Sequence, residues 1–292
     1  MIILIILLNL LLLFYLFIKN KGIKYIFSKK IFRYLIFVGI VAIIIFVVYG
    51  LEFFLNTVTS GLFQGQYKIV SGMIVWNDPM IGILYNFITY FLITGMVEEL
   101  LKTLPVFALN KEFFKEELTT KYDCIIPFLI VGMGFSIVED FLYIYEYYDG
   151  TTGIDIVRLL TEFSGHTLWA LLIGMGYYKY IVKYKAEKLA FNLKTRQLNF
   201  ININMGMSSK SIFALSCAIV IFTHGLFDFL LVTFPILGLI FVGGSLVYFI
   251  VFIVLLRNST LKRDSFNTFM KYQKGIDRQI IKEFIEEKNI KY

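Results

Sequence analysis

Histidine, cysteine, tryptophan and proline are scarce in this chain of 292 residues, which holds two, two, two and four of them respectively. The two cysteines, Cys124 and Cys217, lie in apolar runs, so the sequence excludes a disulfide framework and predicts buried, reduced thiols. Charged residues make up 17% of the chain and hydrophobic residues 58%. Soluble domains contain about 45–50% apolar residues, so this composition excludes an ordinary soluble domain and indicates an integral membrane protein.

Seven stretches are apolar and long enough to cross a hydrocarbon core, which takes about 20 helical residues. They lie near residues 1–18, 34–55, 80–109, 124–148, 157–180, 211–233 and 235–257. No basic segment or evident cleavage site accompanies the first, which we interpret as a retained helix and not as a signal peptide. The sequence therefore predicts an all-α, polytopic bundle of about seven transmembrane helices in the cell membrane, over residues 1–257, followed by a basic cytoplasmic tail, 258–292.

Basic residues indicate the orientation of this bundle. Of the 28 lysines and arginines, 25 lie in segments that alternating spans place on one side, at 19–33, 111–121, 179–210 and 257–291. Basic residues favour the cytoplasmic side, which predicts an outer N-terminus and a cytoplasmic C-terminus. Because the net charge of +7 follows this pattern, lipid is the expected partner and nucleic acid is not.

The segments between and after the spans are predicted to be less regular. Residues 56–79 are expected to form an outer loop, and residues 181–210 a polar, basic loop. In the tail, apolar side chains recur at helical spacing, at Phe269, Tyr272, Ile276, Ile280 and Phe284. This stripe predicts one surface helix, and docking on anionic lipid is the alternative interpretation of it.

Four spans carry ionisable side chains near mid-depth, where such groups are costly and usually mark function. They are Glu98, Glu99 and Lys102 in the third span, Glu139 and Asp140 in the fourth, His166 in the fifth, and His224 and Asp228 in the sixth. Glu98 and Lys102 are one helical turn apart and are expected to pair. Asp228 lies one turn after His224 and is expected to orient its imidazole, whereas a structural role is favoured for Asp140.

This inventory suits three kinds of function. A carboxylate can act as a general base on water, while an imidazole stabilises an oxyanion or protonates a leaving amine, as amide hydrolysis requires. The same groups are ligands of zinc, with Glu139, His166 and His224 as candidates, although no His-Glu-x-x-His motif is present. A proton-coupled transporter would use the same groups, but its broken helices and internal repeat are not seen. A non-catalytic membrane protein that keeps the fold is the third alternative.

Four motifs resemble those of the PrsW family of bacterial intramembrane proteases, which is distantly related to the type II CAAX prenyl endopeptidases. They are Glu98-Glu99-x-x-Lys102, Phe135-x-x-x-Glu139, His166-x-x-Trp169 and His224-x-x-x-Asp228, in family order. The resemblance covers about residues 1–257. It implies a polytopic protease that cleaves a single-pass membrane protein, with an anti-sigma factor as the expected substrate.

The resemblance also implies roles for individual residues. Glu98 is expected to activate water, Glu99 to support it, and His224 to serve the oxyanion or proton-transfer step. Family members are labelled metalloproteases while related enzymes are argued to be glutamate proteases, so both a zinc-dependent and a glutamate-type mechanism are compatible with it. The prenyl endopeptidases have histidine where this chain has Glu139, and we infer that His166 fills that role. Asp140 stands where the family commonly has asparagine, and Phe227 where it often has tryptophan.

Overall fold

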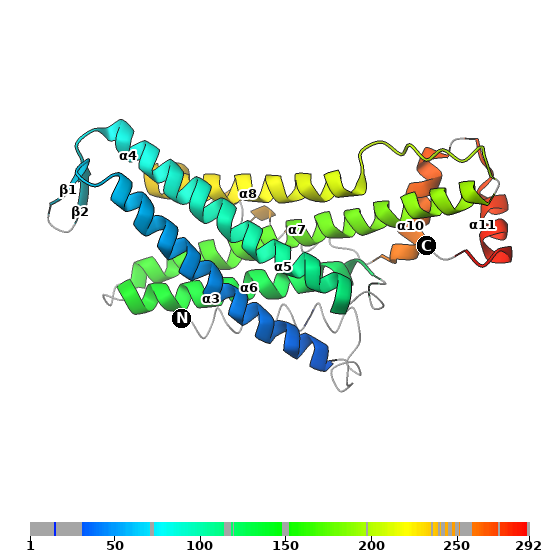
Figure 1. The fold of residues 1–292 in the computed structure, drawn as a ribbon. Helices are drawn as coiled ribbons and strands as arrows, with labels where there is room; N and C mark the ends of the chain where they lie inside the picture. Colours follow the sequence, from blue (N-terminus) through cyan, green and yellow to red (C-terminus); the bar gives the residue numbers. More distant parts are fainter. Residues whose placement is uncertain are drawn as a thin grey trace.

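A computed structural model of the chain describes residues 31–70, 73–113, 118, 120–147, 152–196, 198–234, 259–273 and 275–290, together with Tyr15 and isolated positions between 236 and 251. The predicted spans 1–18 and 235–257 therefore lie largely outside the described residues. Within the described part, helices dominate, as predicted (Figure 1). Four helical segments are long and apolar enough to cross a membrane: Gly39–Leu62, Pro79–Thr103, Lys121–Glu139 and Ser209–Thr233.

The first part of the fold is a long helix, a hairpin and a composite helix. Helix α3 (Ile31–Leu62) leads to strands β1 (Tyr67–Val70) and β2 (Met73–Trp76), which pair antiparallel with Tyr67 opposite Trp76. The hairpin replaces part of the predicted outer loop, because aromatic and β-branched residues flank only two connecting residues. Next, α4 (Pro79–Asn86), the π-helix η1 (Phe87–Val97) and α5 (Glu98–Phe113) follow one another without a break.

Helix α6 (Lys121–Tyr147) is the centre of the bundle. In the part of α6 that could cross a membrane, 72% of the residues are buried, against 17–22% in the other three candidate spans. It packs closely on α7 (Thr152–Thr195), where a Cβ added at Gly132 would lie 2.5 Å from the Cβ of Ala170. The absence of a side chain at Gly132 therefore permits this close packing of the two helices. Helix α8 (Ser209–Thr233) packs against η1 and α7 and completes the described bundle.

The sequence predicts a membrane span over 157–180 followed by a loop, but helix α7 continues well beyond residue 180. It is a single helix of 44 residues, which at about 1.5 Å per residue is twice the length that a bilayer core needs. Residues 181–195 hold neither glycine nor proline and are rich in strong helix formers. They also bury a stripe at helical spacing: Ala186, Leu189, Ala190 and Leu193. The helix therefore continues where the sequence pattern suggested a loop.

The tail packs on this extension of α7 as two helices, α10 (Leu261–Tyr272) and α11 (Arg278–Glu287). The predicted single helix is wrong, since Gly275 adopts a φ of 78° between the two. The break also changes which residues face inward: Ile281 and Ile285 are buried, whereas Ile280 is 62% exposed. We call the end of α7, residues 198–205, α10 and α11 the tail module (Figure 1). It has its own buried core.

A contact between glycines holds α8 beside η1. A Cβ added at Gly95 would lie 2.5 Å from the Cα of Gly225, a backbone atom that cannot rotate away. We expect Gly95→Ala to lower the free energy of unfolding by about 1–3 kcal/mol, as overpacking does. Denaturant unfolding of the purified protein measures this. In the control Gly50→Ala the new methyl meets nothing within 4 Å, so an equal loss in both variants would contradict the explanation.

A buried amine stabilises the tail module. Lys183 on α7 donates a hydrogen bond to the carbonyl of Met205, and its Nζ lies 4.0 Å from the centroid of the Tyr272 ring. Lys183→Met leaves that carbonyl without its donor, which we expect to cost about 1–3 kcal/mol. Faster hydrogen exchange in α10 would report the loss. Lys188→Met, at an exposed position of the same helix, should leave the exchange rates unchanged, and no difference between the variants would refute the role.

Candidate functional site

The ionisable side chains predicted in four spans meet inside the bundle. Glu98, Glu99 and Lys102 come from the first turns of α5, directly after the π-helix η1, a type of segment that often occurs at functional sites. Glu139 comes from α6, His166 from α7, and His224 with Asp228 from α8. Glu98, Glu99, Lys102, His166 and His224 are each at most 5% exposed. The side chain of Asp140 lies outside the described residues.

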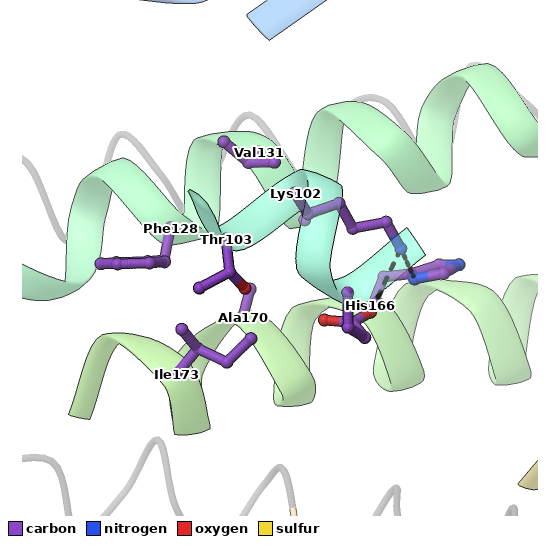
Figure 2. Close-up of a pocket in the computed structure, with 9 residues that line it drawn as sticks. Lys102, Thr103, Phe128, Val131, His166, Ala170 and Ile173 are labelled. Atoms are coloured by element: carbon purple, nitrogen blue, oxygen red, sulfur yellow. Dashed lines mark hydrogen bonds and ion pairs between the residues drawn. The ribbon is translucent and has the colours of Figure 1, made fainter. Parts of the chain in front are cut away.

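Lys102 is the central cation of the site. Its Nζ lies 2.7 Å from Glu98 Oε2 and 3.2 Å from Glu99 Oε1. The same atom is 3.1 Å from His166 Nδ1 (Figure 2). It also lies 3.5 Å from the centroid of the Phe135 ring, so the aromatic face of this motif residue contacts the charge directly. The expected Glu98–Lys102 pair is present, and Lys102 additionally links α5 to α7.

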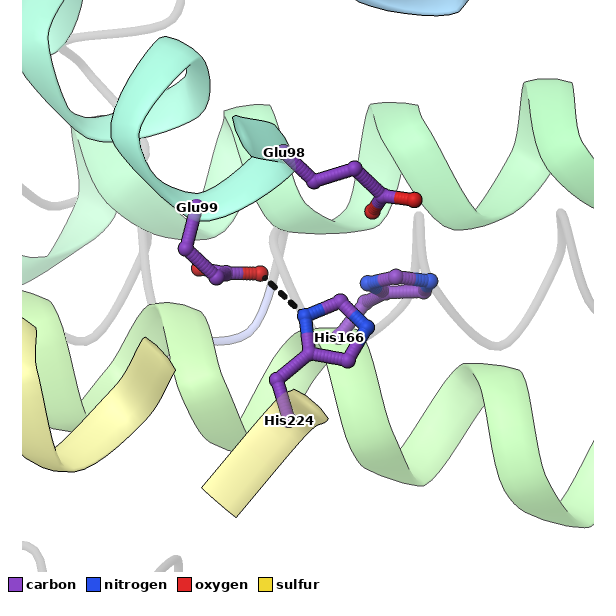
Figure 3. Close-up of side chains that lie close together, drawn as sticks. All are labelled: Glu98, Glu99, His166 and His224. Carbon is purple, nitrogen blue, oxygen red and sulfur yellow. Dashed lines mark hydrogen bonds and ion pairs between the residues drawn. The ribbon is translucent and has the colours of Figure 1, made fainter. Parts of the chain in front are cut away.

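The imidazole of His224 lies between two carboxylates. Its Nδ1 is 2.9 Å from Glu99 Oε1 (Figure 3). Its Nε2 is 3.1 Å from Asp228 Oδ2. A carboxylate accepts hydrogen bonds, so this arrangement suits a ring that donates from both nitrogens. Trp169 stacks on the ring at 3.8 Å between centroids and an angle of 19°, which fixes its plane. The expected partnership of Asp228 and His224 is thus present in the geometry.

His166 has a different hydrogen-bonding environment. Its Nε2 lies 2.7 Å from Glu139 Oε2, whereas its Nδ1 faces the ammonium of Lys102. Because a lysine ammonium only donates hydrogen bonds, His166 Nδ1 accepts one from Lys102. The ring proton is then on Nε2, which donates a hydrogen bond to Glu139. The two histidine rings lie 5.3 Å apart, edge to face. The site therefore holds one imidazole arranged as a double donor and one arranged as donor and acceptor.

Glu52 on α3 is a member of the site that the sequence analysis missed. Its Oε1 accepts a hydrogen bond of 2.9 Å from Thr94, and its carboxyl group lies near that of Glu98. The signal was one acidic residue in the apolar stretch 34–55, close to the expected end of that span. Because α3 continues to Leu62, Glu52 lies two to three turns before the end of the helix. An acidic group at such a position in an apolar span is a candidate for function.

A small cavity adjoins the central cation. Its volume is about 10 Å³, room for about one water molecule, and Glu99, Lys102, Thr103 and His166 are among its lining residues (Figure 2). The hydroxyl of Thr103 is buried and has no hydrogen-bond partner among the described residues. A polar cavity of this size beside such a hydroxyl suits a single buried water.

The residues that can hold a metal differ from the expected set. One ligand atom each from Glu98, Glu99, His166 and His224 lies within 4.8 Å of the others (Figure 3). Glu139 is not in this group, and it contacts His166 Nε2. Two carboxylates and two imidazoles fit zinc by donor type. However, the Lys102 ammonium contacts three of these four residues, so an ion there has to displace it.

Comparison with known proteins assigns the chain to a family. The sequence pattern described as "PrsW family intramembrane metalloprotease" matches residues 31–257. "Protease PrsW" of Clostridioides difficile (strain 630) is 29% identical over 188 residues, which cover 64% of this chain and 66% of that protein. The chain thus spans just under two thirds of that relative's length. No solved structure matches. Because the family pattern covers most of the chain, this multi-pass membrane protein belongs to the PrsW family of intramembrane metalloproteases.

Proposed function

We propose that the protein is an intramembrane endopeptidase that hydrolyses a peptide bond of a membrane-anchored, single-pass protein. The observation that supports this most directly is the buried cluster of Glu98, Glu99, Lys102, His166 and His224, drawn from three helices at one depth. A purely structural ion pair would explain Glu98 and Lys102. It would not explain two imidazoles and further carboxylates placed around the same point. The family resemblance favours an anti-sigma factor as the substrate.

In this proposal Glu98 is the general base. Lys102 contacts one oxygen of Glu98, whereas Glu99 Oε1 is shared between Lys102 and His224, so Glu98 is the less constrained of the two carboxylates. Glu98 takes a proton from water, and the resulting hydroxide forms a C–O bond to the substrate carbonyl carbon. The carbonyl oxygen becomes an oxyanion. The proton then goes to the leaving amine as the C–N bond breaks.

His224 supplies the electrophilic assistance. A ring protonated on both nitrogens is a cation, which can stabilise the developing oxyanion by its charge or give one of its protons to the leaving amine. Glu99 and Asp228 hold this ring, and Trp169 fixes its plane. Glu139 accepts a hydrogen bond from His166 Nε2 and so orients that ring, whose Nδ1 contacts Lys102. Lys102 also keeps Glu98 and Glu99 in position. Were zinc to replace the Lys102 ammonium, Glu98, Glu99, His166 and His224 would hold it, and the ion would supply Lewis-acid activation of the carbonyl group.

Co-expression with tagged candidate single-pass membrane proteins tests the proposal. We expect the wild type to clip a candidate, and Glu98→Ala and His224→Ala to spare it at equal protein levels. Equal levels are the control, because removal of a buried partner can unfold the bundle. If membrane-protein fragments are identical with all three proteins, catalysis is refuted and proton-coupled transport becomes the function to test.

A further inference from the structure

A second cavity, distant in sequence from the proposed catalytic residues, lies between α10 and α11 of the tail module. Its volume is about 330 Å³. Four basic side chains line it, Lys262 and Arg263 from α10 and Arg278 and Lys282 from α11, with Glu286 as the one carboxylate of the lining. A concave surface with an excess of positive charge concentrates anions. The cavity therefore has the chemistry of an anion-binding site.

Most of these cations have no carboxylate partner among the residues that the structure describes. Arg263 Nε lies 3.3 Å from Asp264. Across the described ranges, none of the other three cations is within ion-pair distance of a carboxylate. Arg278 donates to the side-chain amide of Asn267, and both Arg278 and Lys282 lie over the Phe266 ring, at 5.2 and 6.0 Å from its centroid. These two are one turn apart on α11, and like charges at that spacing repel unless an anion lies between them.

The frame that carries the cations is packed. Phe266 is 5% exposed and Ile285 is 8% exposed, and both lining residues belong to the buried core of the tail module. Two hydrogen bonds between Gln273 and the backbone of Asn202, of 2.7 and 2.6 Å, join the end of α10 to the segment after α7. The basic groups therefore project from fixed helices and not from a free chain end.

The cavity also lies close to the expected membrane surface. Thr260 lines it and forms a β-bridge with Thr120, and Lys121 N donates to Ser259 O at 2.9 Å. Lys121 is the first residue of α6 and of a candidate membrane span. The polar headgroup layer extends about 5–8 Å beyond the hydrocarbon core on each side. One wall of the cavity is therefore at the level of lipid phosphates, on the side where the basic loops are predicted.

We propose that this cavity binds the phosphate group of an anionic phospholipid. The phosphate accepts hydrogen bonds from Arg278 and Lys282 on α11 and from Lys262 and Arg263 on α10, and the lipid chains extend toward the start of α6. Such a contact holds the tail module against the membrane surface and fixes the depth of α7, which carries His166 into the bundle. Phosphate binding in this cavity involves none of the proposed catalytic residues.

Native mass spectrometry of the purified, full-length protein in detergent tests this site. The probes are dioleoylphosphatidylglycerol, dioleoylphosphatidylcholine and inorganic phosphate. The variant Arg278→Gln/Lys282→Gln removes two charges from the cavity. The matched control Lys271→Gln/Lys288→Gln also removes two charges, one from α10 and one from the end of α11, but neither residue lines the cavity. Hydrogen exchange in α10 and α11 verifies that both variants keep the tail module folded.

We expect the wild type and the control to retain one phosphatidylglycerol molecule in preference to phosphatidylcholine. The cavity variant should bind it about 30-fold more weakly, since each basic residue near an anionic surface contributes about fivefold. An equal loss in both variants would mean general surface electrostatics and would overturn the site. Retention unchanged in the cavity variant would overturn it as well. Displacement of the lipid by millimolar inorganic phosphate would assign the cavity to free phosphates and refute the lipid as its ligand.

Discussion

Replacing Glu98 with glutamine is expected to abolish peptide-bond cleavage while the protein remains folded. Glutamine keeps the size of the side chain and can still accept a hydrogen bond from Lys102, but it cannot take a proton from water. Loss of general-base catalysis lowers rates by about 10²–10⁴-fold. Cleavage of the substrate identified by co-expression, in liposomes containing purified protein, gives the rate. Thermal unfolding of the same samples gives the stability.

Glu99→Gln is the matched variant, because it removes the neighbouring carboxylate by the same change. Glu99 Oε1 contacts both Lys102 and His224, so glutamine at this position leaves two buried donors that share one neutral oxygen in place of a carboxylate. We expect a loss of stability of about 3–5 kcal/mol in addition to reduced activity, as for other broken buried pairs. If Glu99→Gln instead abolishes cleavage at wild-type stability while Glu98→Gln remains active, the base is Glu99 and the proposed assignment is wrong.

The members of the site were largely predictable because each is an ionisable residue in an apolar span. Their partners were not. Spacing along one helix shows which residues share a face, and it correctly paired Glu98 with Lys102 and His224 with Asp228. It does not show which helices are neighbours. The contact of Lys102 with His166 and the position of Glu52 beside Glu98 depend on how α3, α5 and α7 pack.

The same limit explains the change in the candidate metal ligands. The sequence indicates Glu139, His166 and His224 as candidate ligands. The packing brings Glu98 and Glu99 to the two histidines, and Glu139 contacts His166 through Nε2. In the tail, the apolar stripe was read as one helix because nothing in its periodicity shows the positive φ of Gly275. The extension of α7 was missed for the opposite reason: its polar residues suggested a loop, although its helix formers favoured continuation.

Lys102 is expected to keep divalent metal out of the site, because its ammonium contacts three of the four candidate ligands. We therefore expect Lys102→Gln to bind about one zinc per chain after incubation and desalting, and the wild type to bind far less. Without metal, the variant places two carboxylates in the core with no central cation, which should cost about 3–5 kcal/mol of stability. Added zinc should restore part of this loss, since a ligand that binds only the folded state stabilises it.

Elemental analysis of zinc per chain and thermal unfolding with and without zinc are the two measurements. The double variant Lys102→Gln/His224→Gln is the control, because it removes one of the four ligands together with the cation, and it should lose the zinc that Lys102→Gln gains. One tightly held zinc in the wild type would contradict the prediction. It would mean that Lys102 moves aside, and the two glutamates and two histidines would then act as metal ligands and not as partners of an ammonium.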